Sequence, residues 1–161
     1  MYELCLKIRN WHREVGEDLH IGVLALQGDY AEHINMLHSN NADVSEIRLP
    51  SQLNDVDGLI IPGGESTTIV QLIDIYDFRA ELVEKASQGF PIWGTCAGMI
   101  VMARELTDHR PEPLNLMNIK VSRNAFGRQI DSFEEDLTIK GIDGKFPAVF
   151  IRAPLVVEND S

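Results

Sequence analysis

Four short apolar runs in the first hundred residues predict β-strands. The first run is apolar nearly throughout instead of alternating with polar positions, which is typical of a strand buried on both faces of a sheet. The second run stops at a proline and the third ends in a pair of glycines, and both features favour a strand end. The predicted strands cover residues 21–26, 44–49, 58–62 and 91–95.

Helical patterns follow three of these four runs. Asp29 is expected to cap the first helix, with Glu32 completing a capping box three residues later. Ser66 is expected to cap a second helix over residues 67–87. A third helix is expected over residues 96–106. The second half of the chain contains weaker, strand-like pieces, the clearest of which lie at 136–140 and 148–151.

This alternation of strands and helices defines an α/β fold class. Short connections between alternating strands and helices imply a parallel sheet that is covered on both faces. In open sheets of this kind, ligands bind beyond the carboxyl ends of the strands. The loops that follow residues 26, 62 and 95 are therefore the first places to look for a functional site.

Composition and charge narrow the classes of function. The 161 residues are the usual size of one domain, and 14 basic against 25 acidic residues leave a net charge of −11. A surface this negative repels nucleic acids and anionic lipids. No apolar run approaches the ~18–20 residues that cross a bilayer, and the start of the chain lacks the apolar centre of a signal peptide. We therefore expect a cytoplasmic protein with no nucleic-acid or membrane partner and no metal.

The loop after residue 94 has the form of a nucleophile elbow. Gly94-Thr-Cys-Ala-Gly98 places a cysteine between two glycines at a strand–helix junction, where larger side chains would clash. We expect the helix N-terminus to lower the pKa of the Cys96 thiol, and the Ala97 N–H to face a developing oxyanion. A free cysteine is more often a small buried apolar residue. The flanking glycines favour the nucleophile instead.

The loop after residue 62 offers backbone N–H groups to a ligand. Pro62-Gly-Gly-Glu-Ser-Thr67 combines two glycines with a helix start, which favours an anionic group. The G-K-[ST] ending of a phosphate-binding loop is absent. Taken alone, the segment is explained equally well by a tight turn with a helix cap.

Residues 21–161 resemble the glutaminase subunits of pyridoxal 5'-phosphate synthase, a branch of the class I (triad) glutamine amidotransferases. The combination of GGEST with RNxFGRQxDSF separates this branch from the amidotransferases of nucleotide, tryptophan and histidine biosynthesis. The resemblance implies a flavodoxin-like fold of three layers with a parallel or mixed sheet. The matching segments are GVLALQGDYAEH (22–33), DGLIIPGGESTT (57–68), GTCAGM (94–99), SRNAFGRQIDSFEEDLTIKG (122–141) and FIRAP (150–154).

The resemblance also implies a reaction and a set of site residues. Cys96 would attack the side-chain amide of L-glutamine, release ammonia and leave a γ-glutamyl thioester, with Gly64 and Ala97 forming the oxyanion hole. An arginine suits the carboxylate of an amino-acid ligand. No cofactor is implied. The ammonia would pass to a (β/α)₈-barrel synthase subunit that builds pyridoxal phosphate. The implied glutamine-binding residues are Gly64, Glu65, Ser66, Arg123, Ile151 and Arg152.

The sequence departs from the family at both ends. Residues 1–20 precede the family's first strand, so we expect an N-terminal extension followed by a glutaminase domain over 21–161. The family's catalytic base is the histidine of a His-Pro-Glu motif near the C-terminus, and none of the five histidines here is followed by Pro-Glu. We therefore expect a C-terminally incomplete domain with negligible glutaminase activity, unless another histidine such as His109 serves as the base.

Two other interpretations remain open at this point. The chain could be a non-catalytic protein of the same fold that binds glutamine or docks on the synthase. It could also be an unrelated flavodoxin-like module with a redox cysteine. Turnover of glutamine with the synthase separates the first alternative from the glutaminase, and protection of Cys96 from alkylation by glutamine separates both from the second.

Overall fold

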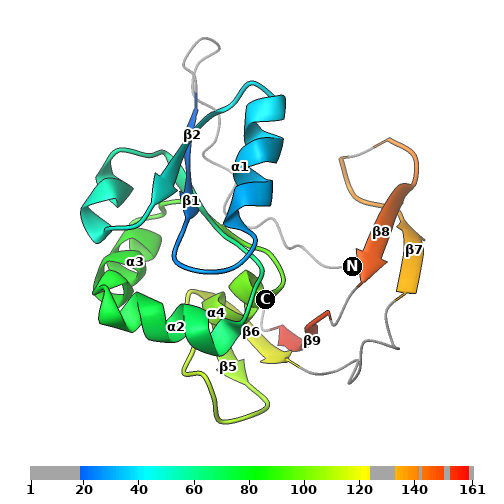
Figure 1. The fold of residues 1–161 in the computed structure, drawn as a ribbon. Coiled ribbons are helices and arrows are strands. Elements are labelled where there is room, and N and C mark those ends of the chain that lie inside the picture. The colour runs from blue at the N-terminus through cyan, green and yellow to red at the C-terminus, as the bar shows by residue number, and fades with distance from the viewer. Residues whose placement is uncertain (1–18, 124–132, 142, 151–152, 160–161) are drawn as a thin grey trace.

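The central feature of the fold is a four-stranded parallel sheet, seen here in a computed structural model (Figure 1). The structure describes residues 19–123, 133–141, 143–150 and 153–159. The strand order is β2-β1-β3-β4, and every neighbouring pair is parallel. This confirms the parallel sheet predicted from the alternating pattern. The strands are β1 (His20–Leu24), β2 (Asp43–Ile47), β3 (Gly58–Ile61) and β4 (Ile92–Gly94).

Helix α1 (Tyr30–Ser39) covers one face of this sheet. Successive side chains of a strand point to opposite faces, so Ile21 and Val23 of β1 and Ile60 of β3 share one side. They pack against Ile34 and other apolar residues of α1. Strand β1 begins at His20, the last residue of the expected extension, and the imidazole of His20 shares a hydrogen bond with Ser45 of β2.

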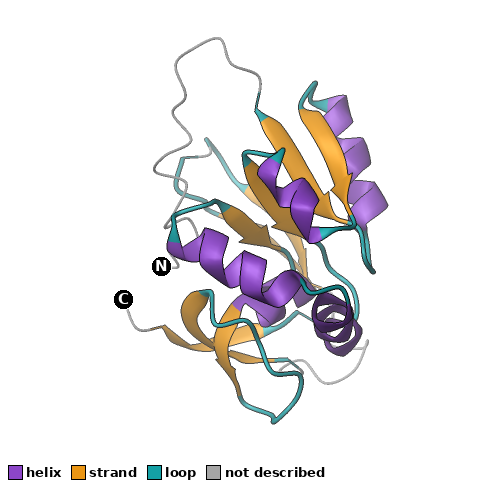
Figure 2. Cartoon of the chain, turned by 90° about the vertical axis from the view of Figure 1, so that its left-hand side faces the viewer, coloured by secondary structure: helices purple, strands orange, loops and turns teal. Residues whose placement is uncertain are grey.

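The opposite face carries the larger part of the core. Helices α2 (Ser66–Ile75) and α3 (Phe78–Ser87) lie on this side together with the short 3₁₀ helix η2 (Pro50–Asn54). Leu24, Leu59 and Ile61 point toward these helices and join their buried side chains in one cluster. The result is the expected three-layer arrangement, with the sheet between α1 and the other helices (Figures 1 and 2).

The single helix expected over 67–87 is wrong, because the structure has two helices there. Asp77 lies between them in the left-handed region, with φ of 60°. The break turns the chain so that Phe78 and Leu82 are fully buried, whereas Tyr76 just before it is exposed. In the described part of the chain, no helix is both long and apolar enough to cross a membrane.

The helix expected over 96–106 is also wrong in its second half. Helix α4 (Ala97–Met102) is followed directly by strand β5 (Ala103–Leu106), which pairs in parallel with β6 (Met117–Ser122). Ala103 and Leu106 are buried against Ile119 and Val121 in a small second core, which stabilises the extended conformation. Strand β9 (Leu155–Asn159) completes this three-stranded sheet by pairing antiparallel to β6.

A separate two-stranded hairpin contains the two strands predicted late in the chain. Strand β7 (Phe133–Leu137) pairs antiparallel with β8 (Phe146–Phe150), and the rings of Phe133 and Phe150 stack with their centroids 4.7 Å apart. Both strands begin earlier than the sequence pattern indicated. The hairpin forms its own sheet, distinct from the parallel sheet that positions the candidate site.

Candidate active site at the carboxyl ends of the parallel strands

Three loops come together where β1, β3 and β4 end. The backbone N–H of Asp29, after β1, donates to the carbonyl of Gly63, after β3, over 3.0 Å. The N–H of Thr95, after β4, donates to the carbonyl of Ile61 over 3.0 Å. These are the loops expected to hold a functional site, and the structure places them side by side.

The Cys96 elbow has the geometry that its flanking glycines predict. Cys96 lies between β4 and α4 with φ of 50° and ψ of −105°, a backbone conformation that non-glycine residues rarely adopt. A Cβ added at Gly94 would lie 2.5 Å from the carbonyl carbon of Gly98, and one added at Gly98 would lie 2.1 Å from the carbonyl oxygen of Ile61. Both distances are too short for any side chain, so the turn requires glycine at both positions.

A methyl group at position 98 is therefore expected to disrupt the elbow. Gly98→Ala should lower the free energy of unfolding by more than about 3 kcal/mol, since its Cβ meets backbone atoms that cannot rotate away. Gly63→Ala is the control, because its nearest neighbour would be the Asp29 side chain at 3.3 Å. Denaturant unfolding checks this prediction, and equal stability of the two variants would contradict the steric account.

The Cys96 thiol does not have the lowered pKa that the sequence suggested. Although Cys96 is exposed as a whole residue, partial burial of its sulfur raises the thiol pKa, and the carboxylate of Asp29 raises it further. The hydrogen bond from the Ala97 N–H acts in the opposite direction and is outweighed. Helix α4 has only six residues, so its dipole is short. The thiol is therefore largely protonated at neutral pH and needs a base.

Asp29 is the N-cap residue of α1, as predicted, and its side chain lies in this site. The Asp29 side chain makes no capping hydrogen bond, so the expected capping box with Glu32 does not form. One carboxylate oxygen lies 3.3 Å from the position that a Cβ at Gly63 would occupy, and that same position is 3.6 Å from the Cβ of Cys96. The carboxylate therefore lies beside the nucleophile.

Removal of this negative charge is expected to make the thiol more reactive. Asp29→Asn should lower the pKa of the Cys96 thiol, because a neighbouring carboxylate disfavours the thiolate. The larger thiolate fraction should speed alkylation of Cys96 by iodoacetamide at neutral pH. Glu32→Gln removes an exposed carboxylate from the same helix and is the matched control. An unchanged or slower alkylation rate in Asp29→Asn would rule out the electrostatic coupling.

The loop after β3 is held by its own side chains. The N-cap of α2 is Glu65, not Ser66 as predicted, and its carboxylate accepts hydrogen bonds from the N–H groups of Thr67 and Thr68 at 3.0 and 2.7 Å. Burial raises the pKa of the Glu65 carboxyl, but these hydrogen bonds outweigh burial and leave the pKa below its usual value. The carboxylate thus stays charged and holds the start of α2.

Gln27 fixes the same loop from the opposite side. Its side-chain oxygen accepts a hydrogen bond from the Glu65 N–H over 3.0 Å. Gly64 has φ of 149°, and a Cβ there would lie 2.8 Å from the Cα of Gly28, so this approach of two backbone segments requires glycine. Sequence reasoning missed Gln27, although it belongs to the QGD segment that follows β1.

Arg123 lies beside this loop, although it is distant in the sequence. It follows β6, and its Nη1 donates to the hydroxyls of Ser66 and Thr67, each over 3.1 Å. Its Nε donates to the Asp108 carboxylate over 2.9 Å. The structure therefore places Arg123 against the start of α2, next to the segment 64–66. The two other predicted binding residues, Ile151 and Arg152, lie outside the described residues.

A histidine that the sequence interpretation passed over lies next to the elbow. His33 of α1 shares a hydrogen bond with the hydroxyl of Thr95, with its Nε2 at 3.0 Å from Thr95 Oγ1. Burial lowers the pKa of His33, although the charges of Asp29 and Glu32 oppose this. His109, the alternative base, lies exposed in the loop after β5, and within the described residues no hydrogen bond connects it to the elbow.

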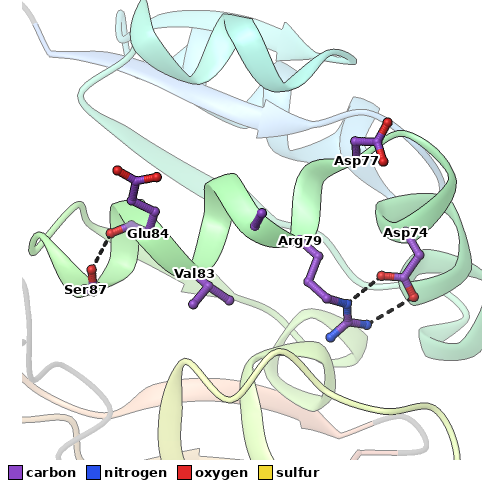
Figure 3. Close-up of a pocket in the computed structure, with 7 residues that line it drawn as sticks. Asp74, Asp77, Arg79, Val83, Glu84 and Ser87 are labelled. Atoms are coloured by element: carbon purple, nitrogen blue, oxygen red, sulfur yellow. Dashed lines mark hydrogen bonds and ion pairs between the residues drawn. The ribbon is translucent and has the colours of Figure 1, made fainter.

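A hollow of about 590 Å³ lies elsewhere, at the junction of α2 and α3 (Figure 3). In it the guanidinium of Arg79 pairs with the carboxylate of Asp74 and also donates to the carbonyls of Glu112 and Pro113. Asp74 is eight positions beyond the helix start at Ser66, which places the hollow about 12 Å along α2 from the candidate site. The described residues also contain no group of three side chains suited to hold a metal ion.

Comparison with known proteins places this chain in a family. Residues 23–161 match the SNO glutamine amidotransferase family. The chain is 56% identical over 139 residues to the pyridoxal 5'-phosphate synthase subunit PdxT of Dehalococcoides mccartyi, a match that covers 84% of this chain and 71% of the relative. It is 53% identical over 140 residues to PdxT of Bacillus velezensis, covering 87% of this chain and 71% of that protein.

A solved structure supports the same assignment. The crystal structure of a glutamine amidotransferase superimposes on this fold with a TM-score of 0.81 and 43% sequence identity. The match covers 87% of this chain and 75% of the other. The α/β fold with its central parallel sheet is therefore that of the glutamine amidotransferases, as the sequence resemblance indicated.

Proposed function

The chain belongs to the SNO glutamine amidotransferase family, and we propose that it acts as a glutaminase whose nucleophile is Cys96. The observation that carries the proposal is the elbow, where a cysteine with φ of 50° lies between two sterically required glycines. The site beside it combines the 63–66 loop with Arg123. An arginine offers charge-assisted hydrogen bonds to the α-carboxylate of an amino-acid substrate.

The reaction would proceed through a thioester. The Cys96 sulfur forms a bond to the side-chain carbonyl carbon of glutamine, and the carbonyl oxygen becomes an oxyanion stabilised by the N–H groups of Gly64 and Ala97. The C–N bond then breaks, and the leaving amino group takes up the proton that the thiol lost to the general base on attack, so that it departs as ammonia. Water hydrolyses the γ-glutamyl thioester to glutamate and restores the thiol.

This mechanism requires a general base, since the thiol pKa is raised. A positioned acid–base group typically contributes about 10²–10⁴-fold to such a step. No histidine of this sequence occurs in the His-Pro-Glu motif of the resembled family. For the 161-residue polypeptide we therefore expect glutamine binding and alkylation of Cys96 by strong electrophiles, but ammonia release that is at least about 100-fold below that of an enzyme with a positioned general base.

We propose further that the ammonia serves pyridoxal 5'-phosphate synthesis. The relatives at 56% and 53% identity carry the name of a pyridoxal 5'-phosphate synthase subunit. The partner would be the barrel synthase subunit that the sequence resemblance implies. The second candidate function is a non-catalytic protein of this fold that binds glutamine or docks on the synthase, and it is favoured by the raised thiol pKa and the unassigned base.

The test of the proposed function is protection of Cys96 by its substrate. L-Glutamine should slow alkylation of Cys96 by iodoacetamide in a saturable manner, whereas L-asparagine, which is one methylene shorter, should protect much less. Absence of protection by glutamine would refute both the glutaminase and the glutamine-binding alternative. Ammonia release above the level given by Cys96→Ala, measured with the synthase subunit present over long incubation, then separates these two, since only the glutaminase gives it.

A further inference from the structure

One side-chain contact connects helix α1 to the residue that precedes the nucleophile. The Nε2 of His33 lies 3.0 Å from the Thr95 hydroxyl, although the two residues are 62 positions apart. The Trp93 ring of β4 meets the same imidazole edge-on, with ring centroids 6.2 Å apart and planes at 76°. The half-buried imidazole is therefore oriented by two residues of the β4 strand and its following turn.

Thr95 is itself part of the frame that holds Cys96 in its strained conformation. Its N–H donates to the Ile61 carbonyl over 3.0 Å, and its carbonyl accepts from the Gly98 N–H over 2.8 Å. With the hydroxyl bound to His33, every polar group of Thr95 has a partner. A non-glycine residue with positive φ persists only where its surroundings hold it, and Thr95 supplies that support on the strand side of Cys96.

We propose that His33 is a positioning residue for Cys96, which acts by fixing the Thr95 hydroxyl and with it the orientation of the elbow. The inference rests on the proposed function and assigns His33 no contact with substrate. A hydroxyl both donates and accepts, so Thr95 can pair with Nε2 whichever ring nitrogen carries the proton. The hydrogen bond between His33 and Thr95 can therefore hold the Thr95 hydroxyl over a broad pH range.

Two reagents that react with the same sulfur separate positioning from reactivity. Iodoacetamide needs only an accessible thiolate. A chloromethyl ketone analogue of L-glutamine reacts efficiently only when the analogue is bound and the sulfur points at its electrophilic carbon, where an S–C bond forms and chloride leaves. The ratio of the two rates at Cys96, measured by peptide mass spectrometry on the full chain, reports the orientation of the thiol independently of its pKa.

Removal of the contact should change this ratio. His33→Leu and Thr95→Val should each slow labelling by the glutamine analogue roughly three- to tenfold, the range expected for one lost hydrogen bond, and leave the iodoacetamide rate within about twofold. The double variant should be no slower than the more affected single variant, because both remove one interaction. His33→Gln, whose amide reaches the former Nε2 position, and Thr95→Ser should retain the parent ratio. His38→Leu alters an exposed histidine of the same helix and is the control.

Each outcome supports or overturns the inference. An unchanged ratio in both His33→Leu and Thr95→Val would overturn it, as would an equal fall with both reagents, which indicates general disruption of the site. If His33→Leu fails to fold by circular dichroism, Thr95→Val decides alone. A parent chain that reacts with iodoacetamide but not with the glutamine analogue would refute the proposed function, and the inference would fall with it.

Discussion

Replacement of Cys96 with alanine is expected to abolish covalent labelling of the chain by the glutamine analogue. Loss of a catalytic nucleophile typically costs at least about 10⁴-fold in rate, and ammonia release with the synthase present should fall to the uncatalysed level. The fold should survive, because the turn is enforced by Gly94 and Gly98 and alanine removes only the sulfur. Mass spectrometry of the labelled protein and its melting temperature check both parts.

The second cysteine of the sequence provides the control for this experiment. Cys5 precedes the described residues and has no flanking glycines. Cys5→Ala should leave labelling by the glutamine analogue unchanged. Labelling that persists in Cys96→Ala and disappears in Cys5→Ala would show that the nucleophile had been misassigned.

Replacement of Arg123 with alanine is expected to weaken glutamine binding by about 1.5–3 kcal/mol, or roughly 10- to 150-fold. Its guanidinium reaches the hydroxyls of Ser66 and Thr67 at the edge of the candidate site, where it would face the substrate carboxylate. The Asp108 carboxylate holds the guanidinium in this direction. The glutamine concentration that half-protects Cys96 from iodoacetamide measures the effect.

Arg79 offers a matched control for Arg123. It also pairs with a carboxylate and with loop atoms, but it lies in the hollow at the junction of α2 and α3 (Figure 3). Arg79→Ala should leave the half-protecting glutamine concentration within about twofold of the parent value. Equal weakening in both variants would mean that Arg123 acts through stability and does not contact glutamine.

The elbow could be predicted from the sequence because its cause is local. Whether Gly94 and Gly98 accept a side chain depends on the tight turn around Cys96 and on the neighbouring strand. The parallel sheet was likewise predictable, since buried strands such as β1 have a nearly continuous apolar pattern. Both features can be predicted with little knowledge of which distant segments of the chain pack together.

The errors in the predicted helices arise from packing between distant segments. Residues 103–106 have good helix formers, but pairing with β6 and burial of Ala103 and Leu106 favour a strand. The break at Asp77 likewise depends on the buried position of Phe78. The helix propensity of a segment gives no information about the partner strand β6 or about the core in which the Phe78 ring is buried.

The pKa values of the site residues also depend on contacts that cannot be read from the spacing of residues in the sequence. The helix N-terminus predicted a lowered thiol pKa, yet the structure places the thiol in a partly buried position beside Asp29. His33 is close to the elbow only because α1 packs along the same sheet. The one available signal was the i, i+4 spacing of Asp29 and His33, which places both on the side of α1 that faces the elbow.

Trapping of the acyl intermediate tests the central claim most directly. The protein is mixed with L-glutamine, with the synthase subunit present, quenched in acid and digested, and each peptide is weighed. Because no general base is assigned, the intermediate should form slowly. Our account predicts that any γ-glutamyl group found after long incubation lies on the peptide that contains Cys96, that hydroxylamine removes it as expected for a thioester, and that Cys96→Ala carries none. Ammonia release without a γ-glutamyl group on Cys96, or with that group on another residue, would contradict it.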